Sequence, residues 1–387
     1  MIQFLRNLLK KKTTIYYKAS VPKLDPAIST MFARCVTYES PNRQLVALRV
    51  PIGQKATGMN HSIDHMASRQ GVFVSILRLL NIDVKRAANV LKDCFKNQEL
   101  RRGCKYKNNE PVEHSTQEVS GDMLIGLCFG YYHARDQLKN EMAVYATNLK
   151  KNQGMLTEGK ISRVGDFHPG LQRSSTPIPI GAQTVTYLAA LLCGIDAYKK
   201  IEKMLPGTKT FPALRKELEK ELFKRMWLYG GFIDVMIPTA GIWFKRGYNN
   251  DNVVLQALYC CYGLCNNPLA RACFGAGMLW TWGLSWPWLN GFFSGLVRNS
   301  IGFLPDRYMK ACQRYAYEFI NIDYSIKVTN REKARSWPVP SQMVNVGEFF
   351  PDEDQEVTKQ GKPEFHSTLG QLANMVWSTQ HERKNTT

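Results

Sequence analysis

Apolar segments with helical spacing recur along the whole chain, and they constrain its fold more than any other feature. In the segment 61–80, apolar residues that include Met66, Ile76 and Leu80 return at the spacing of one helix face. A second apolar segment, 84–95, follows after a very short break. Because helices joined by a short connection pack antiparallel, these two segments are predicted to form a helical hairpin.

The same pairing repeats further along the chain. The predicted partners are 117–133 with 137–149, 181–198 with 212–228, 251–265 with 268–282, 289–297 with 306–320, and a last helix, 367–379, with the N-terminal segment 26–36. About six hairpins of irregular length result, without a strict repeat consensus. The sequence therefore predicts a mainly α fold, and closure of the hairpins on themselves would make an (α/α)6 toroid, a barrel-like array with long loops on one face.

The predicted domain organisation follows from this pattern. Residues 1–50 form an N-terminal basic arm and a short extended segment, with a strand expected in 44–52. Residues 51–380 form the helical-hairpin toroid, and residues 381–387 form a flexible C-terminal tail. Long polar linkers at 154–179, 229–250 and 328–363 are predicted to be loops, and loops of this length are usually functional or disordered.

The charge of the chain indicates an acidic partner. The chain has 387 residues, of which 51 are Lys or Arg and 32 are Asp or Glu, so its formal net charge is +19. Such an excess attracts polyanions, acidic glycans or acidic proteins. Because no basic stripe interleaved with aromatic residues occurs, specific nucleic-acid recognition is not expected. A P-loop, a GxSxG elbow, an HExxH motif and a dinucleotide fingerprint are also absent, so no cofactor is predicted.

The cysteines favour a reduced, cytoplasmic or intracellular setting. Most of the ten cysteines lie within apolar helix-like runs, where free Cys behaves as a small hydrophobic residue. No CxxC pair occurs, and the N-terminus lacks the features of a signal peptide. His61 and His65 share one helix face, but without a catalytic Glu this spacing is a weak metal signal, so no metal site is predicted.

One uncharged segment bears on membrane association. Residues 272–297 contain no charged side chain and are long enough to span a bilayer. However, Pro287 and several glycines interrupt the segment, and its tryptophans cluster in the middle instead of at two interfaces. A buried helix followed by an aromatic loop is therefore the favoured interpretation, although membrane contact stays open.

Candidate site residues lie at helix starts and in the long loops. Asp122 opens a strongly apolar helix, where it either caps the helix or serves as a general acid or base. Asp166 and His168 lie together in a loop, where they form either a proton relay or an ordinary turn. Each of these three residues is a catalytic candidate.

A second polar group precedes the helix predicted at 251–265. Arg246 could neutralise an acidic substrate, Tyr248 could transfer a proton, and Asn249 could orient an oxygen. Asp251 completes the group as a catalytic candidate, and the alternative is a loop that ends in a helix cap.

Aromatic residues supply a candidate binding surface. Trp243, Trp286 and Trp288 lie in or near predicted loops, and Pro287 keeps the last two out of a helix interior. Tryptophan rings can stack on sugars, and they are also common core residues.

The segments SGDMLIGLCFGYYHARD and GYNNDNVVLQALYCCYGL resemble the helix-start patterns of (α/α)6-toroid carbohydrate-active proteins. The resemblance is architectural and extends over most of residues 60–380. It implies a glycan cleft that holds acidic residues, or Asn, His, Tyr and Arg in the lyase relatives. The implied function is binding, hydrolysis or lyase-type cleavage of an acidic polysaccharide. The alternative is a noncatalytic structural or interaction protein, such as a phage virion component.

Overall fold

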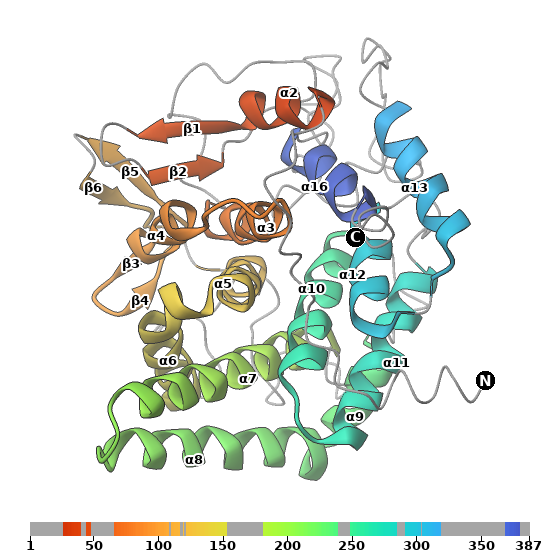
Figure 1. Cartoon of the computed structure of the whole chain (residues 1–387). Helices are drawn as coiled ribbons and strands as arrows, with labels where there is room; N and C mark the ends of the chain where they lie inside the picture. The colour runs from red at the N-terminus through yellow and green to blue at the C-terminus, as the bar shows by residue number, and fades with distance from the viewer. Residues whose placement is uncertain are drawn as a thin grey trace.

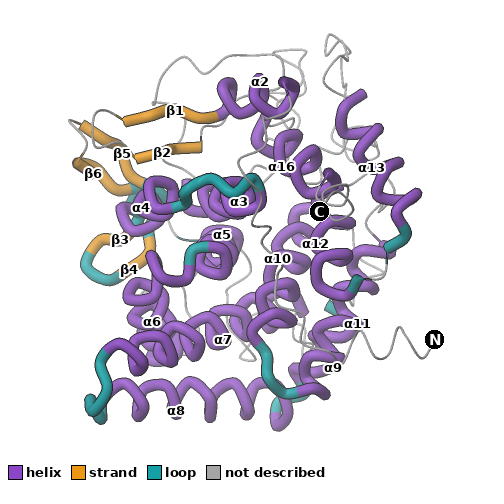
Figure 2. Tube along the Cα trace, viewed as in Figure 1, coloured by secondary structure: helices purple, strands orange, loops and turns teal. Residues whose placement is uncertain are grey.

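The computed structural model describes residues 26–39, 44–47, 66–107, 110–116, 119, 121–152, 181–238, 248–284, 291–302, 304–318 and 368–379. Helices account for 78% of these residues, so the fold is mainly helical, as the periodicity predicts. The helices occur as an inner set and an outer set, with small strand pairs at one side (Figures 1 and 2).

The inner helices have apolar residues on most of their surface and are buried in the centre. They are α3 (Met66–Leu79), α5 (Gly121–His133), α7 (Gly181–Met204), α10 (Tyr248–Leu264), α12 (Gly291–Ile301) and α16 (Thr368–Thr379). A helix that is apolar all round has no face suited to water, so it becomes internal. Each inner helix contacts the next in chain order, and α16 contacts α3, so the order of contacts returns to its start.

Most of the outer helices bury one face and expose another. The outer helices are α2 (Pro26–Cys35), α4 (Lys85–Asp93), α6 (Arg135–Lys151), α8 (Thr210–Phe223), a π-helical turn η2 (Lys224–Leu228), α9 (Gly231–Met236), α11 (Pro268–Leu284) and α13 (Asp306–Glu318). In α4, for example, Ala87, Val90 and Leu91 are buried while Lys85 is exposed. This one-sided burial is typical of helices that cover a core.

The predicted helix pairs are confirmed. Contacts join α3 to α4, α5 to α6, α7 to α8, α10 to α11 and α12 to α13. The pairing of the last helix with the N-terminal helix is also confirmed, because α16 contacts α2 (Figure 1). Segments from opposite ends of the described chain therefore lie side by side.

Two inner helices approach each other at glycines. A side chain on Gly71 of α3 would collide with the backbone carbonyl of Gly126 in α5, and one on Gly126 would collide with α3 at Ala67 and Ser68. The backbones can be this close only because neither residue has a Cβ atom.

The described residues also include three short antiparallel strand pairs. The strand expected in 44–52 is present as β2 (Gln44–Ala47), paired with β1 (Val36–Glu39). The pairs β3 (Phe95–Lys96) with β4 (Glu99–Leu100) and β5 (Cys104–Lys107) with β6 (Glu110–His114) were not predicted.

The turn between β3 and β4 explains why the sequence does not predict that hairpin. Both of its central residues, Asn97 and Gln98, have positive φ angles of 53° and 66°. Two positive φ angles are the mark of the tight turn that suits a two-residue hairpin. Asn is a common residue in that conformation, whereas Gln gives no such signal, so the pattern is hard to recognise.

The linker 229–250 is not a loop throughout, and this part of the prediction is wrong. It contains α9, and α10 already begins at Tyr248. Gly230, with φ of 74°, reverses the chain after η2 and lets Gly231 pack against the backbone of Arg225. Val235 of α9 then packs against α11 at Gly277, so tertiary contacts hold a helix that is too short to be stable alone.

The described cysteines are buried and free, as their apolar surroundings predict.

The uncharged segment 272–297 contributes to two separate helices, α11 and α12, with residues 285–290 between them outside the described part. Within the described ranges, every helix is too short or too polar to reach across a bilayer.

Candidate functional site

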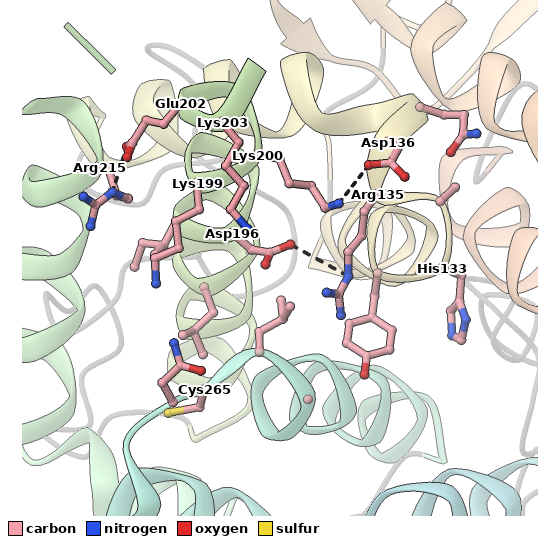
Figure 3. A pocket seen from close by; sticks show the side chains of 18 of the residues that line it. His133, Arg135, Asp136, Asp196, Lys199, Lys200, Glu202, Lys203, Arg215 and Cys265 are labelled. Carbon is pink, nitrogen blue, oxygen red and sulfur yellow. Dashed lines mark hydrogen bonds and ion pairs between the residues drawn. The ribbon is translucent and has the colours of Figure 1, made fainter. Parts of the chain in front are cut away.

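A pocket of about 1150 Å³ opens between α5, α6, α7, α8 and α10. Its wall takes in the last residues of α5 and α10, the second half of α7, and the short connections that follow α3 and α10. Charged side chains dominate the close view of the pocket (Figure 3). The pocket therefore lies at the ends of α5 and α10 where the chain leaves them.

One wall carries a partly exposed carboxylate, that of Asp196. The Tyr131 hydroxyl of α5 donates a 2.8 Å hydrogen bond to Oδ2 of Asp196 in α7. Nε of Arg135 lies 3.8 Å from the same carboxylate oxygen, and its guanidinium lies 4.7 Å from the centre of the Tyr132 ring. Burial, together with the charge of Asp196, raises the pKa of Tyr131, which keeps the hydroxyl protonated and donating.

Three further ion pairs among the described residues lie at the pocket. Nζ of Lys200 donates a 2.8 Å hydrogen bond to Asp136, and this bond lowers the pKa of the Asp136 carboxyl. Arg215 of α8 binds Glu202 at 2.8 Å and Glu219 at 2.7 Å. The hydrogen bond with Glu202 raises the pKa of Arg215, ahead of the contribution of Glu219.

Lys199 and Lys203 add positive charge that these ion pairs do not neutralise. Both line the pocket, and neither forms an ion pair within the described part of the chain. With Asp196 and Lys200 they follow a spacing of three and four residues, so they share one face of α7 (Figure 3). This face therefore presents two ammonium groups that are ready to bind an anion.

His133 closes the pocket on the side of the core. Its side chain is buried, and burial lowers its pKa far below the usual value, with the charges of Arg135 and Arg78 adding to the effect. The ring packs against Phe129 and Tyr259, with ring centres 4.8 Å and 5.9 Å away. His133 is therefore a neutral member of an aromatic cluster at neutral pH.

The aromatic cluster fills the centre of the inner helices. Trp377 of α16 contacts Phe129 of α5, Tyr259 of α10 and Phe292 of α12, with ring centres 5.5 to 6.2 Å apart. All four side chains are buried. His133, which contacts both Tyr259 and Trp377, connects the pocket lining to this buried cluster.

The pocket has the chemistry of a binding site more than that of an acid–base site. Four of its carboxylates, Asp136, Asp196, Glu202 and Glu219, have a cation within 4.0 Å. These ion pairs hold the four carboxylates against protein cations and leave them less available for proton transfer to a ligand. Within the described residues, no group of His, Cys, Asp and Glu side chains is arranged to hold a metal ion.

The predicted site residues that the structure describes lie away from this pocket. Asp122 is in the first turn of α5 and is buried, at 8% exposure. The pocket takes Tyr132 and His133 from the other end of that helix, about 15 Å away at 1.5 Å per residue. Asp122 is the second residue of α5, and a carboxylate in the first turn is stabilised by the positive end of the helix dipole.

The structure describes the remaining predicted site residues only in part. The backbone of Tyr248, Asn249 and Asp251 forms the first turn of α10, again at the end opposite the pocket, and their side chains are outside the description. Others lie wholly outside the described residues, namely Asp166, His168, Trp243, Arg246, Trp286 and Trp288.

Sequence reasoning missed the pocket residues, although one signal was present. Lys199 and Lys200 stand out as a basic pair at the end of an apolar helix, and Lys203 extends the same face. Arg135 and Asp196 are far apart in the sequence, and no local pattern links them. Only the packing of α6, which begins at Arg135, against α7 joins these residues in one wall.

Comparisons with known proteins give no relative. No protein-family model matches the chain, and neither a curated protein nor a solved structure shows significant similarity to it.

Proposed function

We propose that this chain binds an acidic glycan in the pocket beside α7. The observation that carries the proposal is the pair Lys199 and Lys203, whose ammonium groups line the pocket without carboxylate partners among the described residues. A uronate or sulfate group on a sugar would supply the missing negative charge. The net charge of +19 would draw such a polymer toward the surface before it docks.

The size and the polar lining of the pocket support a sugar ligand. Its volume of about 1150 Å³ exceeds the roughly 300–1,000 Å³ of ordinary small-molecule pockets, which suits several linked sugar units. Gln137, Asn266 and Asn267 line it as well, and amide groups both donate to and accept from hydroxyls.

The proposed architecture is the (α/α)6 toroid. Its support is the order of contacts among the inner helices, which runs from α3 through α5, α7, α10 and α12 to α16 and back to α3. The outer helices pair with the inner ones in the sequence that a toroid requires. Processing of the glycan by hydrolysis or elimination is proposed only for the opposite end of the array, where Asp122 is buried at the start of α5.

The test is a binding titration with an oligogalacturonate, a short chain of uronate sugars. We expect the wild-type chain to bind it, a neutral maltooligosaccharide of equal length to bind at least tenfold more weakly, and the Lys199→Ala/Lys203→Ala double variant to lose at least fivefold in affinity. The exposed lysines Lys96 and Lys107 lie outside the pocket and provide the matched double variant, which should bind within twofold of wild type. Equal binding of the neutral sugar, or equal loss in both double variants, would overturn the proposal.

Catalysis has its own test. Turnover of the acidic glycan, followed as new reducing ends or as absorbance near 235 nm, should disappear in Asp122→Asn while binding to the pocket persists. Binding without any turnover in the wild-type chain would remove the catalytic version and leave the binding function in place.

A further inference from the structure

The edge of the molecule made by α8, η2 and α9 exposes large apolar side chains. Their exposed fractions are 57% for Phe223, 65% for Leu228, 62% for Tyr229 and 55% for Ile233. Met236 and Ile237 continue the set at 40% each. Figure 1 shows α8 along one edge of the molecule with α9 beyond its end. Contiguous apolar exposure of this kind marks an interaction site on a folded protein.

Tertiary contacts fix the two parts of this surface next to each other. Gly231, at the start of α9, packs against the backbone of Arg225 in η2, where a side chain would not fit. The Thr184 hydroxyl donates a 2.8 Å hydrogen bond to Asp234, which ties α9 to α7. The exposed apolar residues therefore project from a rigid base.

Lysines flank the apolar residues. Lys216, Lys220 and Lys224 are exposed and follow one another at intervals of four residues, so they form a stripe along α8 into η2. Phe223 and Leu228 lie on or beside the same face. Lys220 also forms a 3.2 Å ion pair with Glu217, whereas Lys216 and Lys224 form no ion pair within the described part of the chain.

The combination of apolar and lysine side chains on the α8–η2–α9 edge favours one class of binding partner over others. A second copy of this chain would bring the lysine stripe close to its own equivalent across a two-fold axis, which is repulsive. A nucleic acid would use the lysines but would leave Leu228, Ile233 and Ile237 in water. An anionic bilayer surface matches both parts, because acyl chains receive the apolar side chains while phosphate and carboxylate headgroups attract the lysines.

We propose that the α8–η2–α9 edge docks on an anionic lipid surface as a peripheral contact, with Phe223, Leu228, Tyr229 and Ile233 entering the headgroup region. This contact is distinct from a membrane span and is independent of the glycan pocket. Tyr229 is held for that role by Arg225, whose guanidinium lies 5.3 Å from the ring centre.

The experiment is co-sedimentation of the full chain with two kinds of vesicle, one of pure phosphatidylcholine and one with about a third phosphatidylserine. We expect the acidic vesicles to bind the chain at least tenfold more tightly. The apolar variant Phe223→Ser/Leu228→Ser and the charge variant Lys216→Glu/Lys220→Glu/Lys224→Glu should each lose at least tenfold.

Two control variants test whether vesicle binding depends on the α8–η2–α9 edge or only on the net charge and apolar exposure of the chain. The variant Lys96→Glu/Lys107→Glu/Lys310→Glu changes the net charge equally at exposed lysines elsewhere and should bind within threefold of wild type. Val112→Ser removes an apolar residue that is 57% exposed on β6 and should also bind normally. Equal loss in the charge control, or absence of binding to acidic vesicles, would overturn the proposal. So would a concentration-dependent dimer that Phe223→Ser/Leu228→Ser dissociates.

Discussion

The Tyr131 hydroxyl donates a 2.8 Å hydrogen bond to the Asp196 carboxylate and so joins α5 to α7 behind the pocket. The donor is buried in the core, while the acceptor faces the pocket and lies beside Arg135. A single polar contact thus links the packing of the inner helices to the charge arrangement of the proposed glycan site. Hydrogen bonds to charged groups are stronger than neutral ones, which makes this link a measurable part of the stability.

Tyr131→Phe should lower the free energy of unfolding by about 1.5–3 kcal/mol, because a bond to a charged acceptor is lost. Urea denaturation followed by far-UV circular dichroism measures the effect. Tyr198→Phe is the matched control on α7, since its hydroxyl shares a 2.7 Å hydrogen bond with the neutral Thr147. Its cost should be smaller, about 0.5–1.5 kcal/mol. Equal losses in the two variants would contradict a charged acceptor for Tyr131.

Gly126→Ala should be strongly destabilising, because the new methyl group would meet the backbone of α3 at Ala67 and Ser68. Overpacking of a core costs about 1–3 kcal/mol, and backbone cannot move aside as a side chain can. Thermal unfolding should show a clear fall in Tm. Gly121→Ala in the same helix meets no atom within 4 Å and should be neutral or slightly stabilising. A Gly126→Ala protein as stable as Gly121→Ala would show that α3 and α5 are further apart.

Gln70→Leu should cost about 2–4 kcal/mol, because it leaves buried backbone groups without partners. The Gln70 amide donates to the carbonyl oxygens of Leu45 at 2.7 Å and Ala87 at 2.9 Å, and it accepts a 3.0 Å bond from the Ala47 N–H. Urea unfolding gives the cost, and faster amide exchange at Ala47 would locate it. Unchanged exchange at Ala47 would count against this role in holding β2.

His133→Phe should flatten the dependence of stability on pH on the acid side. The buried imidazole has a lowered pKa in the folded state, so below about pH 6.5 the unfolded chain takes up a proton that the folded chain does not. Wild-type stability is therefore lost as the pH falls from that value toward the folded pKa, by up to about 1.4 kcal/mol per pH unit. Unfolding free energies measured between pH 7 and pH 5 give both slopes. Identical slopes for variant and wild type would refute this account of His133.

Much of the helical organisation follows from the sequence alone. Apolar spacing located α3 and α4, and it also foresaw that α16 would pack against α2. This succeeded because burial of one helix face requires a period that is visible in the residues themselves. The pocket is different, since Arg135 and Asp196 acquire a shared role only when α6 lies against α7.

The sequence by itself determined that the chain is helical, that its helices pair in order, and that its cysteines lie among apolar residues. These properties are local or compositional. The hydrophobic effect favours burial of an apolar helix face whichever segment covers it. The tertiary structure decided which helix ends meet, which lysines of α7 line the pocket without carboxylate partners in the described part of the chain, and which apolar residues of α8 and α9 stay exposed. Those properties depend on distances between segments that are far apart in the chain, and side-chain chemistry becomes a site only once such distances are fixed.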